Sequence, residues 1–125
     1  MRKVAALSAL LALAAFPAAA TDGTAFMDGT GLYDKCRTQG GRLVLHGYMA
    51  GVFDTHSLIT AVRELNSVNS PSLLCVPKGV VLEQLTDIAC KYLSEHPEER
   101  HYPGAALALI AVIKAFPCTP SPASK

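Results

Sequence analysis

The sequence lacks an excess of positive charge, and this excludes two classes of partner. The chain holds 11 basic and 10 acidic residues. Its first 20 residues, which we predict are removed, contain two of the basic residues and none of the acidic ones, so nine basic residues remain against ten acidic ones. A chain without a basic excess has no electrostatic attraction for nucleic acid or anionic lipid. We therefore expect neither nucleic acid nor membrane among the partners of the mature protein.

Long apolar runs are also missing. The uncharged run near the N-terminus, 4–16, and the most apolar later segment, 105–116, are both shorter than the roughly 18–20 residues that cross a bilayer. The first run follows Arg2 and Lys3 and precedes the small residues 18–20, the pattern of a secretory signal. The sequence thus predicts a signal peptide over 1–20, cut after Ala20, and a periplasmic location for the mature chain.

Catalytic and metal-binding motifs are scarce. No two cysteines form a CxxC pair, and no phosphate-binding glycine loop follows a strand. Asp54, His56 and Ser57 are too close along the chain to converge as a catalytic triad does. The histidines are scattered and show no metal-ligand spacing: His46, His56, His96 and His101. We therefore expect no enzyme activity, no metal site and no cofactor.

What the chain does have is an even number of cysteines, which in an exported domain predicts two disulfides. Cys75 precedes the third expected helix and Cys118 follows the fourth, so an antiparallel hairpin brings them to the same end. Cys75–Cys118 is the first choice, which leaves Cys36–Cys90. Cys90 lies on the opposite side of its helix from Val81, so it either faces a second covering element or reaches another copy of the chain.

Hydrophobic periodicity predicts an all-α fold, a small bundle of about four helices. The expected domain spans 31–118, between a flexible leader over 21–30 and a disordered tail over 119–125. The helices are expected near 31–37, within 42–68, up to Ser94 and over 104–115, and a stripe on the third is formed by Val81, Leu85, Ile88 and Tyr92.

Two features interrupt the second expected helix. Asp54 to Ser57 are residue types that cap helices, so we expect a break or bend there, followed by a restart. Gly47 and Gly51 put two small residues on one face, which lets another helix approach closely. Together with the apolar final helix, that face predicts a homodimer.

The segment 95–101 is polar and lies between two apolar helices. Most such segments are solvated connectors, but loops on a rigid scaffold also carry binding sites. The candidate partner-binding residues are His96, Glu98, Glu99, Arg100 and His101.

Three stretches, GYMAGVFD, CVPKGVVLEQL and KYLSEHPEERHYPGAALALIAVIKAFPC, resemble the Rap/Tai immunity family over about 31–118. The resemblance implies a small helical periplasmic protein, often dimeric. Its characterised members bind peptidoglycan amidase toxins delivered by type VI secretion and block the substrate groove. Members often carry a cysteine at the position of Leu45, so the resemblance agrees with a partner of Cys36 relocated to Cys90.

Two other functions stay open from the sequence alone. One is a periplasmic binding or structural protein that has the fold without a toxin partner. The other is a hydrolase that uses His46 or His56.

Overall fold

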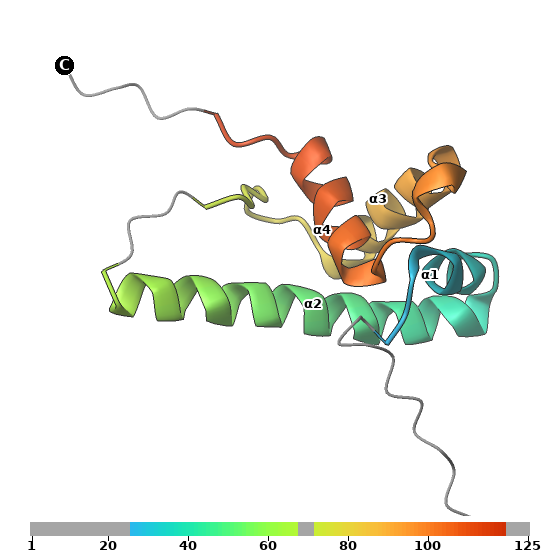
Figure 1. The fold of residues 1–125 in the computed structure, drawn as a ribbon, viewed down its shortest axis with the longest axis horizontal. Coiled ribbons are helices and arrows are strands. Elements are labelled where there is room, and N and C mark those ends of the chain that lie inside the picture. Colours follow the sequence, from blue (N-terminus) through green and yellow to red (C-terminus); the bar gives the residue numbers. More distant parts are fainter. Residues whose placement is uncertain (1–25, 68–71, 120–125) are drawn as a thin grey trace, which may run out of the picture.

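The computed structural model describes residues 26–67 and 72–119, so the predicted signal peptide lies outside the described residues. In the described part the chain forms four α-helices and one short 3₁₀ helix (Figure 1). The all-α prediction is confirmed. The elements are α1 (Gly29–Cys36), α2 (Gln39–Leu65), α3 (Leu82–Glu95), the 3₁₀ helix η1 (Pro97–Glu99) and α4 (Gly104–Ala115).

Side chains at the helix starts explain these boundaries. Asp28 accepts a hydrogen bond from the amide of Gly31 at 2.8 Å, so α1 begins two residues earlier than predicted. Thr38 caps α2 in the same way, by accepting from the amide of Gly41 at 3.0 Å. Both caps satisfy amides that the first turn of a helix leaves unpaired.

The predicted break in the second helix is wrong, because α2 runs without interruption for 27 residues. Ser57 donates its hydroxyl hydrogen bond to the carbonyl of Phe53 at 2.9 Å, and Thr60 donates to that of His56 at 3.0 Å. Hydroxyl groups bonded to the preceding turn of their own helix do not cap a new one. The residues expected to restart a helix therefore lie inside α2.

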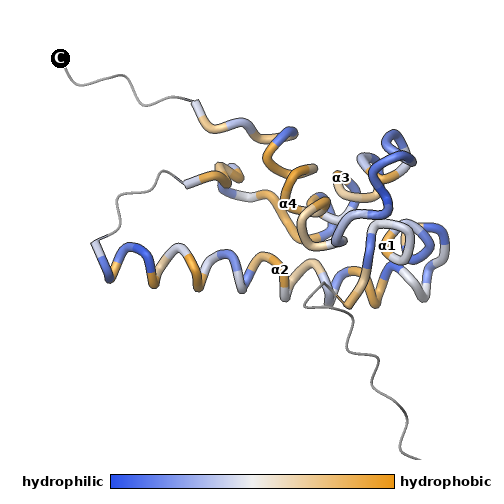
Figure 2. The backbone as a smooth tube through the Cα atoms, viewed as in Figure 1, coloured by the Kyte–Doolittle hydropathy of each residue, from blue (hydrophilic) through white to orange (hydrophobic). Residues whose placement is uncertain are grey.

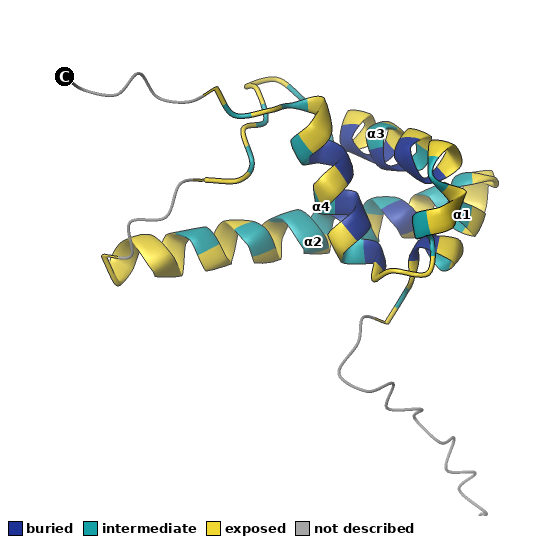
Figure 3. Ribbon diagram, turned by 45° about the horizontal axis from the view of Figure 1, so that its top comes forward, coloured by how far each residue is buried: buried dark blue, intermediate teal, exposed yellow. Residues whose placement is uncertain are grey.

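The core lies between α3, α4, α1 and the first half of α2, as the dark blue segments in Figure 3 show. On the predicted stripe, Leu85 and Tyr92 are buried, whereas Val81 precedes α3 and is 56% exposed. Ala89 and Leu93 are buried as well, so α3 is covered over a wider face than the stripe predicted. The buried side chains of α4 are Leu107, Ala108, Ala111 and Val112.

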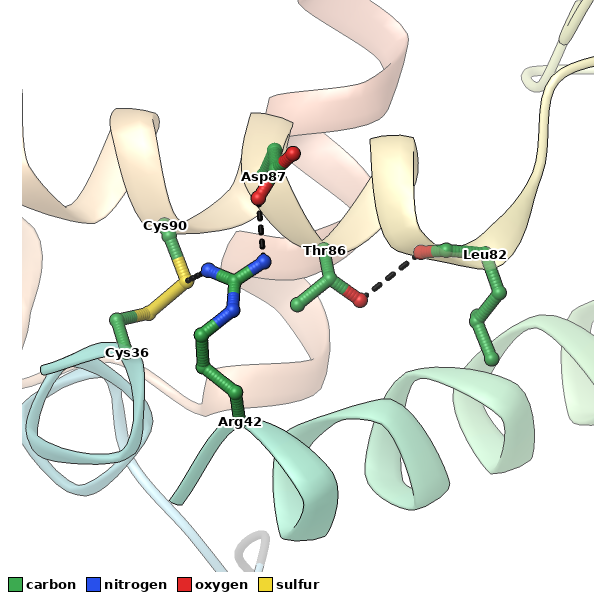
Figure 4. Close-up of polar contacts among 6 residues, drawn as sticks. All are labelled: Cys36, Arg42, Leu82, Thr86, Asp87 and Cys90. Carbon is green, nitrogen blue, oxygen red and sulfur yellow. Dashed lines mark hydrogen bonds and ion pairs between the residues drawn. A yellow bond between two sulfur atoms is a disulfide. The ribbon is translucent and has the colours of Figure 1, made fainter. Parts of the chain in front are cut away.

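The two disulfides have the predicted pairing. Cys36–Cys90 joins α1 to α3, with Cα atoms 5.7 Å apart, and Cys75–Cys118 joins the segment before α3 to the segment after α4. Cys90 therefore bonds within the chain, and α1 is the element that covers its side of α3 (Figure 4). Leu45 is buried in the core.

An ion pair also links α2 to α3 beside the first disulfide. Arg42 forms an ion pair with Asp87, and its other terminal nitrogen lies 4.0 Å from the sulfur of Cys90 (Figure 4). Thr86 is fully buried, and its hydroxyl donates to the carbonyl of Leu82 at 2.9 Å. The polar groups at this junction are therefore satisfied within the fold.

The second half of α2 extends beyond the other helices (Figure 1), and apolar positions recur along it (Figure 2). Gly47 and Gly51 both face open space, since no atom lies within 4 Å of a Cβ built at either residue. The close approach of another helix to these glycines does not occur within the described chain. Nor does any helix in residues 26–67 and 72–119 combine the length and apolar character needed to cross a membrane.

Candidate functional site

The segment His96–Pro103, called the connector below, joins α3 to α4 and is held against the start of α1 by backbone hydrogen bonds. The amide of Gly29 donates to the carbonyl of Tyr102 at 3.0 Å, and that of Thr30 donates to the carbonyl of Arg100 at 2.9 Å. These bonds join residues about 70 positions apart in the sequence. A loop tied down at its backbone presents its remaining side chains in a fixed arrangement.

A glycine makes this close approach possible. A Cβ at Gly29 would lie 2.8 Å from the Cα of Arg100 and 2.9 Å from its carbonyl oxygen, closer than two such atoms pack. Gly104 has the same role at the other end of the connector, where its amide donates to the carbonyl of Met27 at 2.8 Å. The connector and the first turn of α1 therefore depend on each other.

Arg100 points inward and fixes the connector to two helices. Its Nε donates to the carbonyl of Leu93 at 2.7 Å, which satisfies an acceptor in the last turn of α3. Its guanidinium carbon lies 3.6 Å from the centre of the Tyr33 ring on α1. A cation over an aromatic face is attracted by the ring electrons.

Glu99 is held by a buried tyrosine. The hydroxyl of Tyr92, a side chain only 6% exposed, donates to the carboxylate of Glu99. Lys114 of α4 donates to the same hydroxyl oxygen at 3.0 Å. Burial raises the pKa of Tyr92, and the hydrogen bond to Glu99 raises it further. The hydrogen bond to Tyr92 raises the pKa of Lys114.

His96 belongs to the same arrangement. Its ring stacks on that of Tyr92 with centres 4.1 Å apart, and its Nδ1 lies 2.9 Å from the carbonyl oxygen of Tyr92. Three of the five predicted partner-binding residues, His96, Glu99 and Arg100, thus make contacts that hold the connector in place.

Glu98 and His101, the other two, are exposed. Tyr102 is 52% exposed, and its ring centre lies 4.0 Å from that of His101. Sequence reasoning missed Tyr102, although a tyrosine directly after a polar loop is a residue type that interfaces favour. The exposed side chains of the connector therefore include Glu98, His101 and Tyr102.

Asp54, His56 and Ser57 do not form a catalytic triad. Asp54 and His56 lie two positions apart on one continuous helix, so their side chains point about 200° apart around its axis. Ser57 donates to a carbonyl of its own helix instead of to an imidazole. In the described residues no group of three or more His, Cys, Asp or Glu side chains is placed to hold a metal ion.

Comparison with known protein families gives one clear match. The model of the Rap1a immunity proteins matches residues 28–118, from the cap of α1 to the last cysteine. No curated protein and no solved structure matches the chain significantly. The family match contains every helix of the described residues, both disulfides and the connector. The chain belongs to the Rap1a immunity protein family, and its role is therefore immunity to an effector of type VI secretion.

Proposed function

We propose that this protein resides in the periplasm and inhibits a peptidoglycan amidase toxin by binding it through the exposed side chains of the connector. The proposal rests on the observation that some side chains of the connector make contacts within the fold while others are exposed. Arg100 and Glu99 fix the connector to α1 and α3, while Glu98, His101 and Tyr102 are exposed. A loop that is already ordered loses little conformational entropy when it binds.

The chemistry of the exposed side chains suits a protein partner. The exposed ring of Tyr102 offers apolar area together with a hydroxyl group, the His101 ring lies beside it, and tyrosine is enriched at the energetic centres of interfaces. A short loop at the end of a helical hairpin also has a shape that enters a concave substrate groove. The protein would then act by occlusion and without catalysis of its own.

The periplasmic location is supported by two features that do not depend on the family. The first 20 residues have the pattern of a cleavable signal. The two disulfides are typical of an oxidising compartment. A peptidoglycan-cleaving toxin acts in that same compartment.

The proposal is tested with the protein encoded by the neighbouring gene. Co-expression of the two proteins should give a stable complex, and export of this chain should protect cells that direct the toxin to their periplasm. If the neighbouring protein neither binds nor is neutralised, the inhibitor function is wrong, and a binding protein without a toxin partner becomes the better account.

We also propose that the inhibitor is a homodimer. The sequence predicts this from the apolar α4 and the open face at Gly47 and Gly51, which stays uncovered within the described chain. Light scattering at micromolar concentration should give the mass of a dimer, and the mass of a monomer would contradict the proposal.

A further inference from the structure

The outer face of α4 carries a line of exposed residues that begins at the connector. Ala106, Ile110 and Lys114 follow one another at steps of four, so they lie on one side of the helix. All three are exposed, and Ile110 retains 38% of its accessible surface. Tyr102 of the connector precedes Ala106 by four positions and borders the same groove as they do. We call these four residues the α4 stripe.

A groove of about 380 Å³ lies along the α4 stripe, and most of the residues that line it are apolar. Its other walls come from α3, the connector and α4, and consist of Tyr92, Glu99, Pro103 and Leu107. Tyr92 and Leu107 are buried core residues, so packing fixes the floor of the groove. The groove is therefore formed before any partner arrives and has room for a large side chain.

Lys114 lies at the polar end of this groove. Its Nζ donates to the Tyr92 hydroxyl at 3.0 Å and lies 4.7 Å from the centre of the Tyr92 ring. An ammonium group has three N–H donors, so this bond leaves two. The carboxylate of Glu99 is engaged by the hydrogen of the same hydroxyl, and no ion pair of the described residues includes Lys114. The exposed ammonium group can thus donate to an acceptor on a partner.

We propose that the α4 stripe continues the toxin-binding surface of the connector and receives an apolar side chain of the toxin together with a neighbouring carboxylate. The apolar side chain lies in the groove between Tyr102 and Ile110, and the carboxylate accepts from Nζ of Lys114. This inference rests on the function proposed for the connector. It adds the chemistry of the toxin segment that the inhibitor recognises.

Continuity with the connector identifies the toxin as the occupant. Tyr102 belongs both to the exposed side chains of the connector and to the wall of the groove, so a protein that covers one meets the other. A stable interface buries about 800 Å² on each partner, more than three side chains of one loop provide. The outer face of α4, an apolar helix (Figure 2), begins directly after the connector and supplies further area.

The cation gives the contact its chemical selectivity. A purely apolar partner would leave Lys114 covered without an acceptor, and covering an unpaired charge is costly. A carboxylate beside the apolar side chain removes that cost and fixes the direction in which the toxin segment lies along α4.

The test changes α4 and leaves the connector intact. Ile110→Ala removes apolar area from the groove, and Lys114→Gln removes the charge while its amide can still donate to the Tyr92 hydroxyl. Ala106→Gln adds bulk at an exposed position of the stripe and removes no contact of the core. The matched controls are Leu73→Ala and Lys78→Gln, two exposed positions outside the stripe.

Each variant is titrated calorimetrically with the purified protein encoded by the neighbouring gene. Ile110→Ala and Ala106→Gln should each weaken binding at least about tenfold, as expected for changes in the closely packed part of an interface. Lys114→Gln should weaken it about fivefold at low ionic strength and less at high ionic strength, because salt screens an exposed ion pair. Both controls should bind as the unchanged protein does.

The outcomes separate this proposal from the one on which it rests. If Glu98→Ala with His101→Ala weakens binding while Ile110→Ala and Ala106→Gln do not, the stripe is wrong and the connector function stands. If the unchanged protein does not bind, both are wrong. A lower mass of Ile110→Ala in light scattering without toxin would assign the stripe to contact between two copies and overturn the proposal.

Discussion

Replacing Arg100 by alanine should destabilise the fold and loosen the connector together. The substitution removes the hydrogen bond from Nε to the carbonyl of Leu93 and the contact of the guanidinium with Tyr33. A hydrogen bond to a charged group contributes about 1.5–3 kcal/mol, and a cation over a ring at a partly exposed site about 0.5–1 kcal/mol. Because these two contributions are lost together, we expect the free energy of unfolding to fall by about 2–4 kcal/mol.

The assay is urea unfolding followed by far-ultraviolet circular dichroism, with both disulfides intact. Arg37→Ala is the matched control, because Arg37 is exposed at the end of α1; it should change the free energy of unfolding by less than about 0.5 kcal/mol. Arg100→Lys should recover only part of the loss, since a lysine cannot place a planar group on Tyr33. A loss of less than about 0.5 kcal/mol in Arg100→Ala would refute the role assigned to this side chain.

Three further predictions concern the same framework. The first disulfide closes a loop of 54 residues. Its removal in the double variant Cys36→Ser, Cys90→Ser should lower the free energy of unfolding by about 4 kcal/mol on the chain-entropy estimate. An unchanged urea midpoint would contradict this. Gly29→Ala should be destabilising by more than about 1 kcal/mol, because its Cβ would collide with the connector backbone; a melting temperature equal to that of the unchanged protein would show that the segments can separate freely. The raised pKa values of Tyr92 and Lys114 mean that the folded state holds these protons more tightly than the unfolded chain does. Their contribution to stability should therefore be complete below the ordinary pKa values near 10 and be lost as the pH rises through the folded values. Tyr92→Phe should lose less stability at alkaline pH in the same titration, and an equal loss would contradict the assignment.

The hairpin of α3 and α4 was predictable from the sequence because its signals are local. A proline precedes α4, the link to α3 is short, and Cys75 and Cys118 flank the pair. Antiparallel packing follows from those features and predicts the disulfide Cys75–Cys118. The two remaining cysteines, Cys36 and Cys90, can then pair only with each other. The position of Cys90 was ambiguous because the covering helix, α1, is distant in the sequence.

Two features could not be predicted from local signals. Ser57 can cap a helix or bond back to its own helix, and only the structure shows that it donates to the carbonyl of Phe53. In the connector, Glu99 and Glu98 are adjacent carboxylates in the sequence. Glu99 is held by Tyr92 and Glu98 is exposed, a difference that depends on how the connector folds back onto α3.

The proposed inhibition depends on binding of the toxin by Glu98, His101 and Tyr102, the exposed side chains of the connector. The most direct measurement is a calorimetric titration of the cognate toxin with the triple variant Glu98→Ala, His101→Ala and Tyr102→Ala. The control is a variant with Glu83→Ala and Lys91→Ala on the exposed face of α3. We predict that the triple variant keeps its thermal stability and binds at least about a hundredfold more weakly, as expected when the centre of an interface is removed, while the control binds as the unchanged protein does. Unchanged affinity in the triple variant would contradict the account.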